Sequence, residues 1–155
     1  MTETAVGVSV WEQTLLEMLE SHVHEEEEVE NDYRSLAEQV AAPDVQFLIR
    51  LILEDEERHH RWLGQLASSV RALTTGDPRP EIPWLGQLED RDVLREATKR
   101  FLRVERADAK GLRHLIKELK DVEETTLWAL LVKIMLLDTQ KHVEILRFIE
   151  HRTRL

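Results

Sequence analysis

Two stretches of this chain repeat one pattern, an apolar helix interrupted by an acid and a histidine. Residues 51–63 read LILEDEERHHRWL and residues 134–146 read IMLLDTQKHVEIL. Aligned without gaps, they place the same residue types four positions apart: Asp55 and His59 in the first, Asp138 and His142 in the second. Residues three or four apart share a helix face. Each copy therefore directs an acid and an imidazole towards the apolar side of its helix, and the fold must accommodate them there.

The size and composition of the chain predict one all-α domain, residues 1–155. A chain of this length buries about two-thirds of the surface that its unfolded form exposes, so a second domain is not needed. Hydrophobic residues make up 42% and charged residues 34%, as is typical of a helical protein. Five glycines and four prolines leave little room for the turns of an all-β fold.

Charge and residue usage argue against several classes of function. The formal net charge of −10 disfavours nucleic acid as a partner, because a phosphate backbone requires a basic face. The absence of cysteine excludes disulfides, iron–sulfur clusters and thiolate zinc sites. The N-terminus has no basic leader region, and no apolar run approaches about eighteen residues. We therefore expect a cytoplasmic protein with no membrane partner.

Apolar residues at steps of three and four predict two long helices in the first half of the chain, at about 9–40 and 44–73. Ser9 and Glu12 have the spacing of a capping box at the start of the first helix. Pro43 disfavours helix in the residue before it and suits the first turn of the second helix. Because the connection is short, the two helices are expected to be antiparallel neighbours.

A long linker and two further helices are predicted for the second half. Residues 74–89, with glycine and three prolines, form the linker, and helices follow at about 90–120 and 122–152. The N-cap signals are Asp90 for the third helix, and Asp121 with Glu124 for the fourth. An extended linker of this length reaches roughly 50 Å, and a thirty-residue helix is roughly 45 Å long. The linker therefore permits a long crossover between helices two and three of a four-helix bundle.

Each predicted helix carries acids or histidines near the midpoint of its apolar stripe. These candidate metal ligands are Glu26 on the first helix, Glu56 and His59 on the second, Glu105 and Asp108 on the third, and Asp138 and His142 on the fourth. A buried charge costs on the order of several kcal/mol unless it is paired or bound to metal, and no inward lysine or arginine is clearly placed to pair with them. Protonation, an ion pair or a metal ion would each offset that cost. Carboxylates with two imidazoles favour iron or manganese over calcium or thiolate-bound zinc.

These residues resemble the ferritin-like superfamily, and rubrerythrin-type domains more than ferritins. The segment ILEDEERHHRWL is similar to the second-helix motif of that group. Glu26 lies seven residues before Tyr33 in a context, Tyr-Arg-Ser-Leu-Ala, that is similar to the first helix. The pair Glu105 and Asp108 resembles the two acids of the third helix. The resemblance implies a ferritin-like four-helix bundle with its long crossover between helices two and three.

The fourth helix departs from the family pattern. Thr139 stands where the family places a glutamate three residues before a histidine, here His142, and the nearest acid is Asp138. A shorter carboxylate at a different angle binds or bridges metal differently. A dinuclear, a mononuclear and a vestigial site all remain open.

The resemblance implies a di-iron or di-manganese carboxylate centre used in oxygen or peroxide redox chemistry, or in iron handling. On this reading the protein is a homo-oligomer, a dimer or larger, and a non-haem oxidoreductase that draws electrons from a separate donor, because it has no cysteine-rich module. No catalytic residue is assigned. The alternative is a non-catalytic helical bundle, with a vestigial or mononuclear site, that acts in oligomerisation or partner binding.

Overall fold

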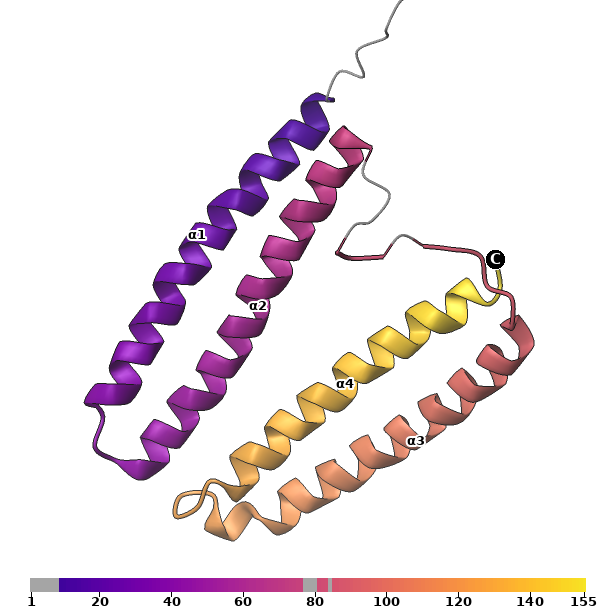
Figure 1. Cartoon of the computed structure of the whole chain (residues 1–155). Coiled ribbons are helices and arrows are strands. Elements are labelled where there is room, and N and C mark those ends of the chain that lie inside the picture. Colours follow the sequence, from indigo (N-terminus) through magenta and orange to yellow (C-terminus); the bar gives the residue numbers. More distant parts are fainter. Residues whose placement is uncertain (1–8, 77–80, 84) are drawn as a thin grey trace, which may run out of the picture. The chain divides into compact units, whose positions relative to one another are not determined.

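The computed structural model describes residues 9–76, 81–83 and 85–155. Within these residues the chain forms helices and no strands (Figure 1). The elements are α1 (Val10–Gln39), α2 (Pro43–Thr75), α3 (Arg91–Glu118), a short 3-10 helix η1 (Lys120–Val122) and α4 (Trp128–Arg152). The all-α prediction is confirmed. In the described part of the chain, no helix combines the length and the apolar character needed to cross a bilayer.

The predicted signals at the ends of the first two helices are confirmed. The Ser9 N–H donates to Glu12 Oε2 at 2.8 Å, and the Glu12 N–H donates to Ser9 Oγ at 3.2 Å, which completes the capping box of α1. Pro43 is the first residue of α2, where its missing N–H costs nothing. Gly76 ends α2 with φ of 71°, a left-handed conformation that favours glycine.

The predicted start of the fourth helix at 122 is wrong, because α4 begins at Trp128. Asp121 and Glu124 do not form the expected cap, and the chain makes a 3-10 turn there instead. The Thr126 hydroxyl donates to the Val122 carbonyl at 2.9 Å and accepts from the Trp128 N–H at 3.4 Å. A β-branched threonine that bonds the local backbone in this way favours a turn over a helix. Asp90 does precede α3, but its side chain makes no capping hydrogen bond.

The chain divides into two compact units, Met1–Leu85 and Gly86–Leu155. The first contains the antiparallel hairpin of α1 and α2, and the second contains the antiparallel hairpin of α3 and α4 (Figure 1). Each hairpin is described by itself. The predicted single domain over residues 1–155 stays a prediction.

In the first hairpin, α1 and α2 pack through residues that recur at steps of three and four. The buried or half-buried positions of this stripe on α1 are Leu19, Val23, Glu26, Glu30, Tyr33 and Ala37. Those on α2 are Ile49, Leu53, Glu56, His60, Leu63, Ala67 and Val70. Both stripes are apolar at their ends and polar at their centres. Glu26, Glu30, Glu56 and His60 therefore lie between the two helices.

In the second hairpin, small side chains allow α3 and α4 to approach closely. The most buried positions are Thr98, Leu102 and Ala109 on α3, and Ala129, Val132 and Thr139 on α4. The buried Thr139 hydroxyl donates to the Met135 carbonyl at 3.1 Å, so its polar group is satisfied within its own helix. Thr139, where the family resemblance expects a metal-binding glutamate, is therefore part of the contact with α3.

The predicted linker at 74–89 is non-helical in its described part after Gly76. The Ile82 N–H donates to Ser69 Oγ at 3.3 Å, which ties this segment to the end of α2. The Arg152 guanidinium donates to the Gly86 carbonyl within the second unit. Residues 77–80 and Trp84 lie outside the described residues.

Each hairpin also exposes a second apolar stripe, next to the one that its two helices share. In the first hairpin the exposed members repeat about every seven residues: Val29 and Leu36 on α1, and Val45, Ile52, Leu66 and Leu73 on α2. In the second they are Phe101 and Leu115 on α3, and Trp128 and Met135 on α4. Apolar faces of this kind indicate further packing, because monomeric soluble proteins rarely leave them in water.

Candidate metal site

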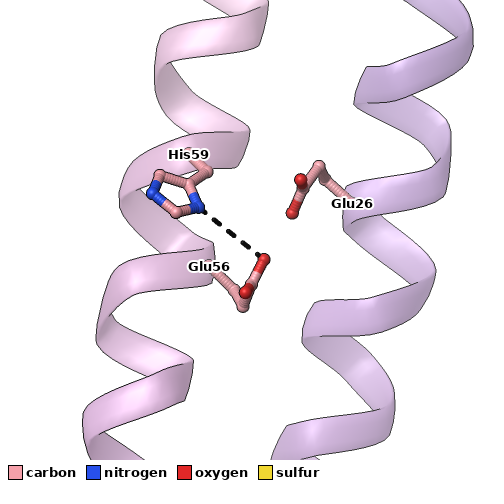
Figure 2. A group of neighbouring side chains, drawn as sticks. All are labelled: Glu26, Glu56 and His59. Atoms are coloured by element: carbon pink, nitrogen blue, oxygen red, sulfur yellow. Dashed lines mark ion pairs between the residues drawn. The ribbon is translucent and has the colours of Figure 1, made fainter.

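Three of the predicted ligands converge in the first hairpin. Glu26 of α1 faces Glu56 and His59 of α2, and one potential ligand atom of each lies within 4.8 Å of the others. Figure 2 shows the two carboxyl groups pointing towards each other across the helix pair, with the imidazole one turn along α2. The His59 Nδ1 lies 3.9 Å from Glu56 Oε2.

The helical periods of α1 and α2 place these side chains. Glu26 lies between Val23 and Glu30 on the stripe of α1 that packs on α2, and it is half-buried while its neighbours in the run 25–28 are exposed. The prediction that Glu26 is the inward member of that run is therefore confirmed. Glu56 occupies the corresponding stripe of α2 and is 21% exposed. His59 is rotated towards the exposed apolar stripe and is 45% exposed.

The two carboxyl groups interact unfavourably when both are charged. A hydrogen bond with Glu26 raises the pKa of Glu56, and burial and the negative charge of Glu26 raise it further, while His59 acts in the opposite direction. Two carboxyl groups can share a hydrogen bond only if one is protonated. The buried Glu26 Oε2 has no hydrogen-bond partner among the residues that the structure describes. This pair therefore requires either a proton or a cation.

The donor set fits a transition metal. Atoms that bind one ion at about 2.1 Å lie at most about 4.2 Å apart, so atoms within 4.8 Å reach a common ion by side-chain movements of less than about 1 Å. Two carboxylates with one imidazole suit iron, manganese or zinc better than calcium, which prefers oxygen alone. Three protein donors also leave coordination positions for water or an oxidant.

An ion-pair cluster lies one helical turn from this group. The Glu30 carboxylate accepts from the Arg34 guanidinium at 2.6 Å and lies 3.1 Å from His60 Nδ1. Arg34 also reaches Glu57 at 3.1 Å. The hydrogen bond from Arg34 lowers the pKa of Glu30, and His60 adds to that effect against the cost of burial. This cluster bridges α1 and α2 and maintains their register.

This cluster was not predicted from the sequence, where no lysine or arginine was identified among the inward positions. Arg34 nevertheless lies four residues after Glu30, the spacing at which opposite charges pair on a helix. That spacing was available in the sequence. Arg34 neutralises Glu30 and not Glu26, so the group of Glu26, Glu56 and His59 keeps its need for a proton or a cation.

The second hairpin brings together a smaller set. Glu105 of α3 and His142 of α4 lie 3.4 Å apart. Asp108, Asp138 and His142 line one groove of about 520 Å³ in this hairpin. Asp138 also pairs with Lys141 at 2.7 Å. Acids and an imidazole therefore gather here too, but over a wider area than in the first hairpin.

The seven predicted ligands thus have different environments. Among the residues that the structure describes, Glu26, Glu56 and His59 are the one group of three or more such side chains close enough to hold an ion together. Glu105 and His142 form a pair, and Asp108 and Asp138 are exposed on the wall of the groove. The constellation of all seven stays a prediction.

Comparison of the chain with models of known protein families, with curated proteins and with solved structures yields no match in any of the three.

Proposed function

We propose that the first hairpin binds an iron or manganese ion through Glu26, Glu56 and His59, and that the protein is a ferritin-like metal protein. The observation that carries this proposal is the buried Glu26 Oε2, which has no hydrogen-bond partner in the described part of the chain and faces a second carboxyl group and an imidazole. A cation at this point offsets the repulsion between the carboxylates and completes the bonding of that oxygen.

The chemistry that this group supports is oxygen or peroxide reduction, or iron handling. A bound iron or manganese ion supplies one-electron redox chemistry. Glu26 and Glu56 contribute negative charge, which favours the more oxidised state of such an ion. His59 is 45% exposed, so solvent contacts this member of the group. The chain contains no cysteine, so a redox function requires a separate electron donor.

The proposal also includes the arrangement of the four helices and a dinuclear metal centre. We keep the prediction of a ferritin-like bundle with a long crossover, in which Glu105, Asp108, Asp138 and His142 contribute to a dinuclear centre. The four long helices in the expected order and the exposed apolar stripe of each hairpin support it. A homo-oligomer and a cytoplasmic location belong to the same proposal.

A second function is supported by a different observation. Thr139 is only 7% exposed and packs on α3, so the position of the expected glutamate contributes to helix packing. This favours a bundle with a mononuclear or vestigial site that acts in oligomerisation or partner binding. The two functions differ in the number of metal ions bound per chain.

The test is to measure metal content and metal affinity in matched variants. Protein purified without added metal or chelator is analysed for iron, manganese and zinc, and Mn²⁺ binding is measured by calorimetry. We expect the double variant Glu56→Ala/His59→Leu to lose the bound metal and to remain folded.

The control is His24→Ala/Glu28→Ala, which removes an exposed histidine–glutamate pair of α1 with a separation of 3.6 Å. We expect this control to bind metal as the wild type does. The proposal is rejected if both double variants keep the wild-type metal content, or if the wild type binds no iron, manganese or zinc after anaerobic addition. One ion per chain favours the second function over the dinuclear centre.

A further inference from the structure

Helix α3 carries a continuous stripe of basic side chains. Its members are Lys99, Arg103, Arg106, Lys110, Arg113 and Lys117, which follow one another at steps of four and three. All six are exposed, and they lie next to the stripe of α3 that packs on α4. Like charges at this spacing destabilise a helix, so the stripe is not explained by the stability of α3.

The acids nearby do not neutralise this stripe. Lys99 pairs with Glu96 at 2.9 Å. Within the described residues, Arg106, Lys110, Arg113 and Lys117 have no acidic group within the 4.0 Å of an ion pair. Most of the stripe therefore presents uncompensated positive charge to the solvent, in a chain whose net charge is −10.

A groove between α3 and α4 lies beside the basic stripe and includes two of its arginines. It has a volume of about 280 Å³, and its charged lining residues are Arg106 and Arg113 of α3 and Glu144 and Arg147 of α4. Arg147 is paired with Glu144 at 2.8 Å, whereas the guanidinium groups of Arg106 and Arg113 form no ion pair with a described residue. The planar guanidinium group binds carboxylates with two parallel hydrogen bonds. The groove is therefore suited to carboxylate side chains from a partner.

Helix α1 of the same chain has the complementary charge. It contains ten acidic residues and one basic residue, Arg34. Seven of the acids are exposed: Glu17, Glu20, Glu25, Glu27, Glu28, Asp32 and Glu38. Glu25, Glu28 and Asp32 follow at steps of three and four on the side of α1 turned away from α2.

We propose that the basic stripe of α3 binds the acidic outer face of α1 from a second copy of this chain. Residues 1–85 contain 18 acidic and 6 basic residues, and residues 86–155 contain 13 acidic and 15 basic residues. Two copies therefore attract each other only when the second half of one meets the first half of the other. Because the contact joins two different surfaces, it generates a ring or an open chain of subunits.

A nucleic acid is a poorer occupant of this stripe. The net charge of −10 opposes the binding of a phosphate backbone, because both carry negative charge. The acidic face of α1 is itself helical, so its length and its charge spacing match those of α3. This inference goes beyond metal binding, and it changes none of the proposed ligands.

The test measures self-association by sedimentation at low and high salt. We expect the wild type to associate at 50 mM NaCl and to bind itself at least about tenfold more weakly at 500 mM, because salt screens exposed charges. The variant Arg106→Glu/Lys110→Glu/Arg113→Glu is expected to lose this salt-dependent association. The control Lys133→Glu, an exposed charge reversal on α4, is expected to behave as the wild type does.

A complementary variant makes the test specific. Glu25→Lys/Glu28→Lys/Asp32→Lys reverses the face of α1, and we expect it to lose association by itself. Mixing the α1 variant with the α3 variant restores opposite charges at both contacts, so a mixed complex is expected to form at low salt. Circular dichroism verifies that each variant is folded.

Three results would each overturn the proposal. The first is a wild type that is monomeric at low salt. The second is association that is insensitive to salt and to both triple variants. The third is a mixture in which the two folded triple variants do not combine. Salt-dependent binding of duplex DNA to the wild type, lost in the α3 variant, would assign the stripe to nucleic acid instead.

Discussion

Replacing Glu56 by glutamine should stabilise the metal-free protein and abolish its stabilisation by metal. In the wild type, the Glu26 and Glu56 carboxyl groups approach within 4.8 Å. The amide of glutamine carries no charge and can donate a hydrogen bond to the Glu26 carboxylate. The substitution therefore removes a repulsion from the metal-free protein, which raises its free energy of unfolding. It also removes a ligand from the metal-bound protein, which lowers the stabilisation by metal.

The size of the first effect follows from the separation of the charges. Two unit charges about 4.8 Å apart repel by about 3.5 kcal/mol at an effective dielectric constant of about 20, and by about 0.9 kcal/mol in water. Glu56 is 21% exposed, so solvent screens part of the interaction and about 1–2 kcal/mol is expected. For a chain of this size, 1 kcal/mol corresponds to roughly 2–4 °C in melting temperature.

The pH dependence of stability provides an independent test of the effect of Glu56→Gln. The pKa of Glu56 is raised above its ordinary value of 4.5 in the folded protein. The protonated carboxyl group is therefore favoured by folding, and its contribution to stability is present below pH 4.5 and lost as the pH rises through the folded pKa. We expect Glu56→Gln and the wild type to have similar stability near pH 4, with the variant increasingly more stable up to pH 7.

The assay is thermal unfolding followed by circular dichroism, in EDTA and in Mn²⁺. At a Mn²⁺ concentration about one hundred times the dissociation constant, the wild type should gain about 2.7 kcal/mol, and Glu56→Gln should gain little. The order of the two melting temperatures is expected to reverse between the two conditions. A variant that is less stable than the wild type in EDTA at pH 7, or that gains as much from Mn²⁺, would refute this reasoning.

Two further predictions concern the packing of the hairpins, and both are measured by chemical unfolding of the metal-free protein. Glu30→Gln is expected to lower the free energy of unfolding by about 1 kcal/mol at pH 7, because it weakens the charged hydrogen bond from Arg34 within α1 and the contact with His60 of α2. The pKa of Glu30 is lowered in the folded protein, so the stability that its carboxylate contributes is present above pH 4.5 and is lost as the pH falls through the folded pKa. The variant lacks this carboxylate, so its stability should fall less in acid than that of the wild type. An unchanged dependence of stability on pH would contradict the pairing of Glu30 with Arg34 and His60. Leu102→Ala should lower the free energy of unfolding by about 2–4 kcal/mol, because Leu102 is buried between α3 and α4. The control Val104→Ala, on the exposed side of α3, should change it by less than about 0.5 kcal/mol. Equal effects of the two substitutions would contradict the assigned packing of α3 on α4.

Much of the secondary structure could be predicted from local signals. The capping box at Ser9, Pro43 and the glycine- and proline-containing linker each act within a few residues, so their effect on the backbone can be read without knowing the fold. The start of α4 could not be read in this way. Asp121 and Glu124 have the spacing of a cap, but the hydroxyl of Thr126 bonds the backbone of the preceding turn, and α4 begins only at Trp128.

The periodicity of the sequence also identified the polar midpoint of each stripe, but with limited angular precision. Adjacent residues differ by about 100° around a helix, so an apolar stripe selects Glu26 from a run of four acids. It does not separate the stripe shared by two helices from the exposed stripe beside it. His59 and Asp108 lie on the exposed side, whereas Glu56 and Glu105 lie nearer the partner helix.

The sequence alone thus determined where the helices lie, apart from the start of α4, and that each carries acids or histidines near its centre, because both properties depend on residues close together in the chain. Tertiary structure decided which of these side chains meet. Glu30 pairs with His60 across the two helices, whereas Glu26 faces Glu56 and His59 and forms no ion pair with a lysine or arginine of the described residues. The reason is geometric: the rotation and axial offset of α1 against α2 select the partners, and residues about thirty positions apart carry no local signal of that offset.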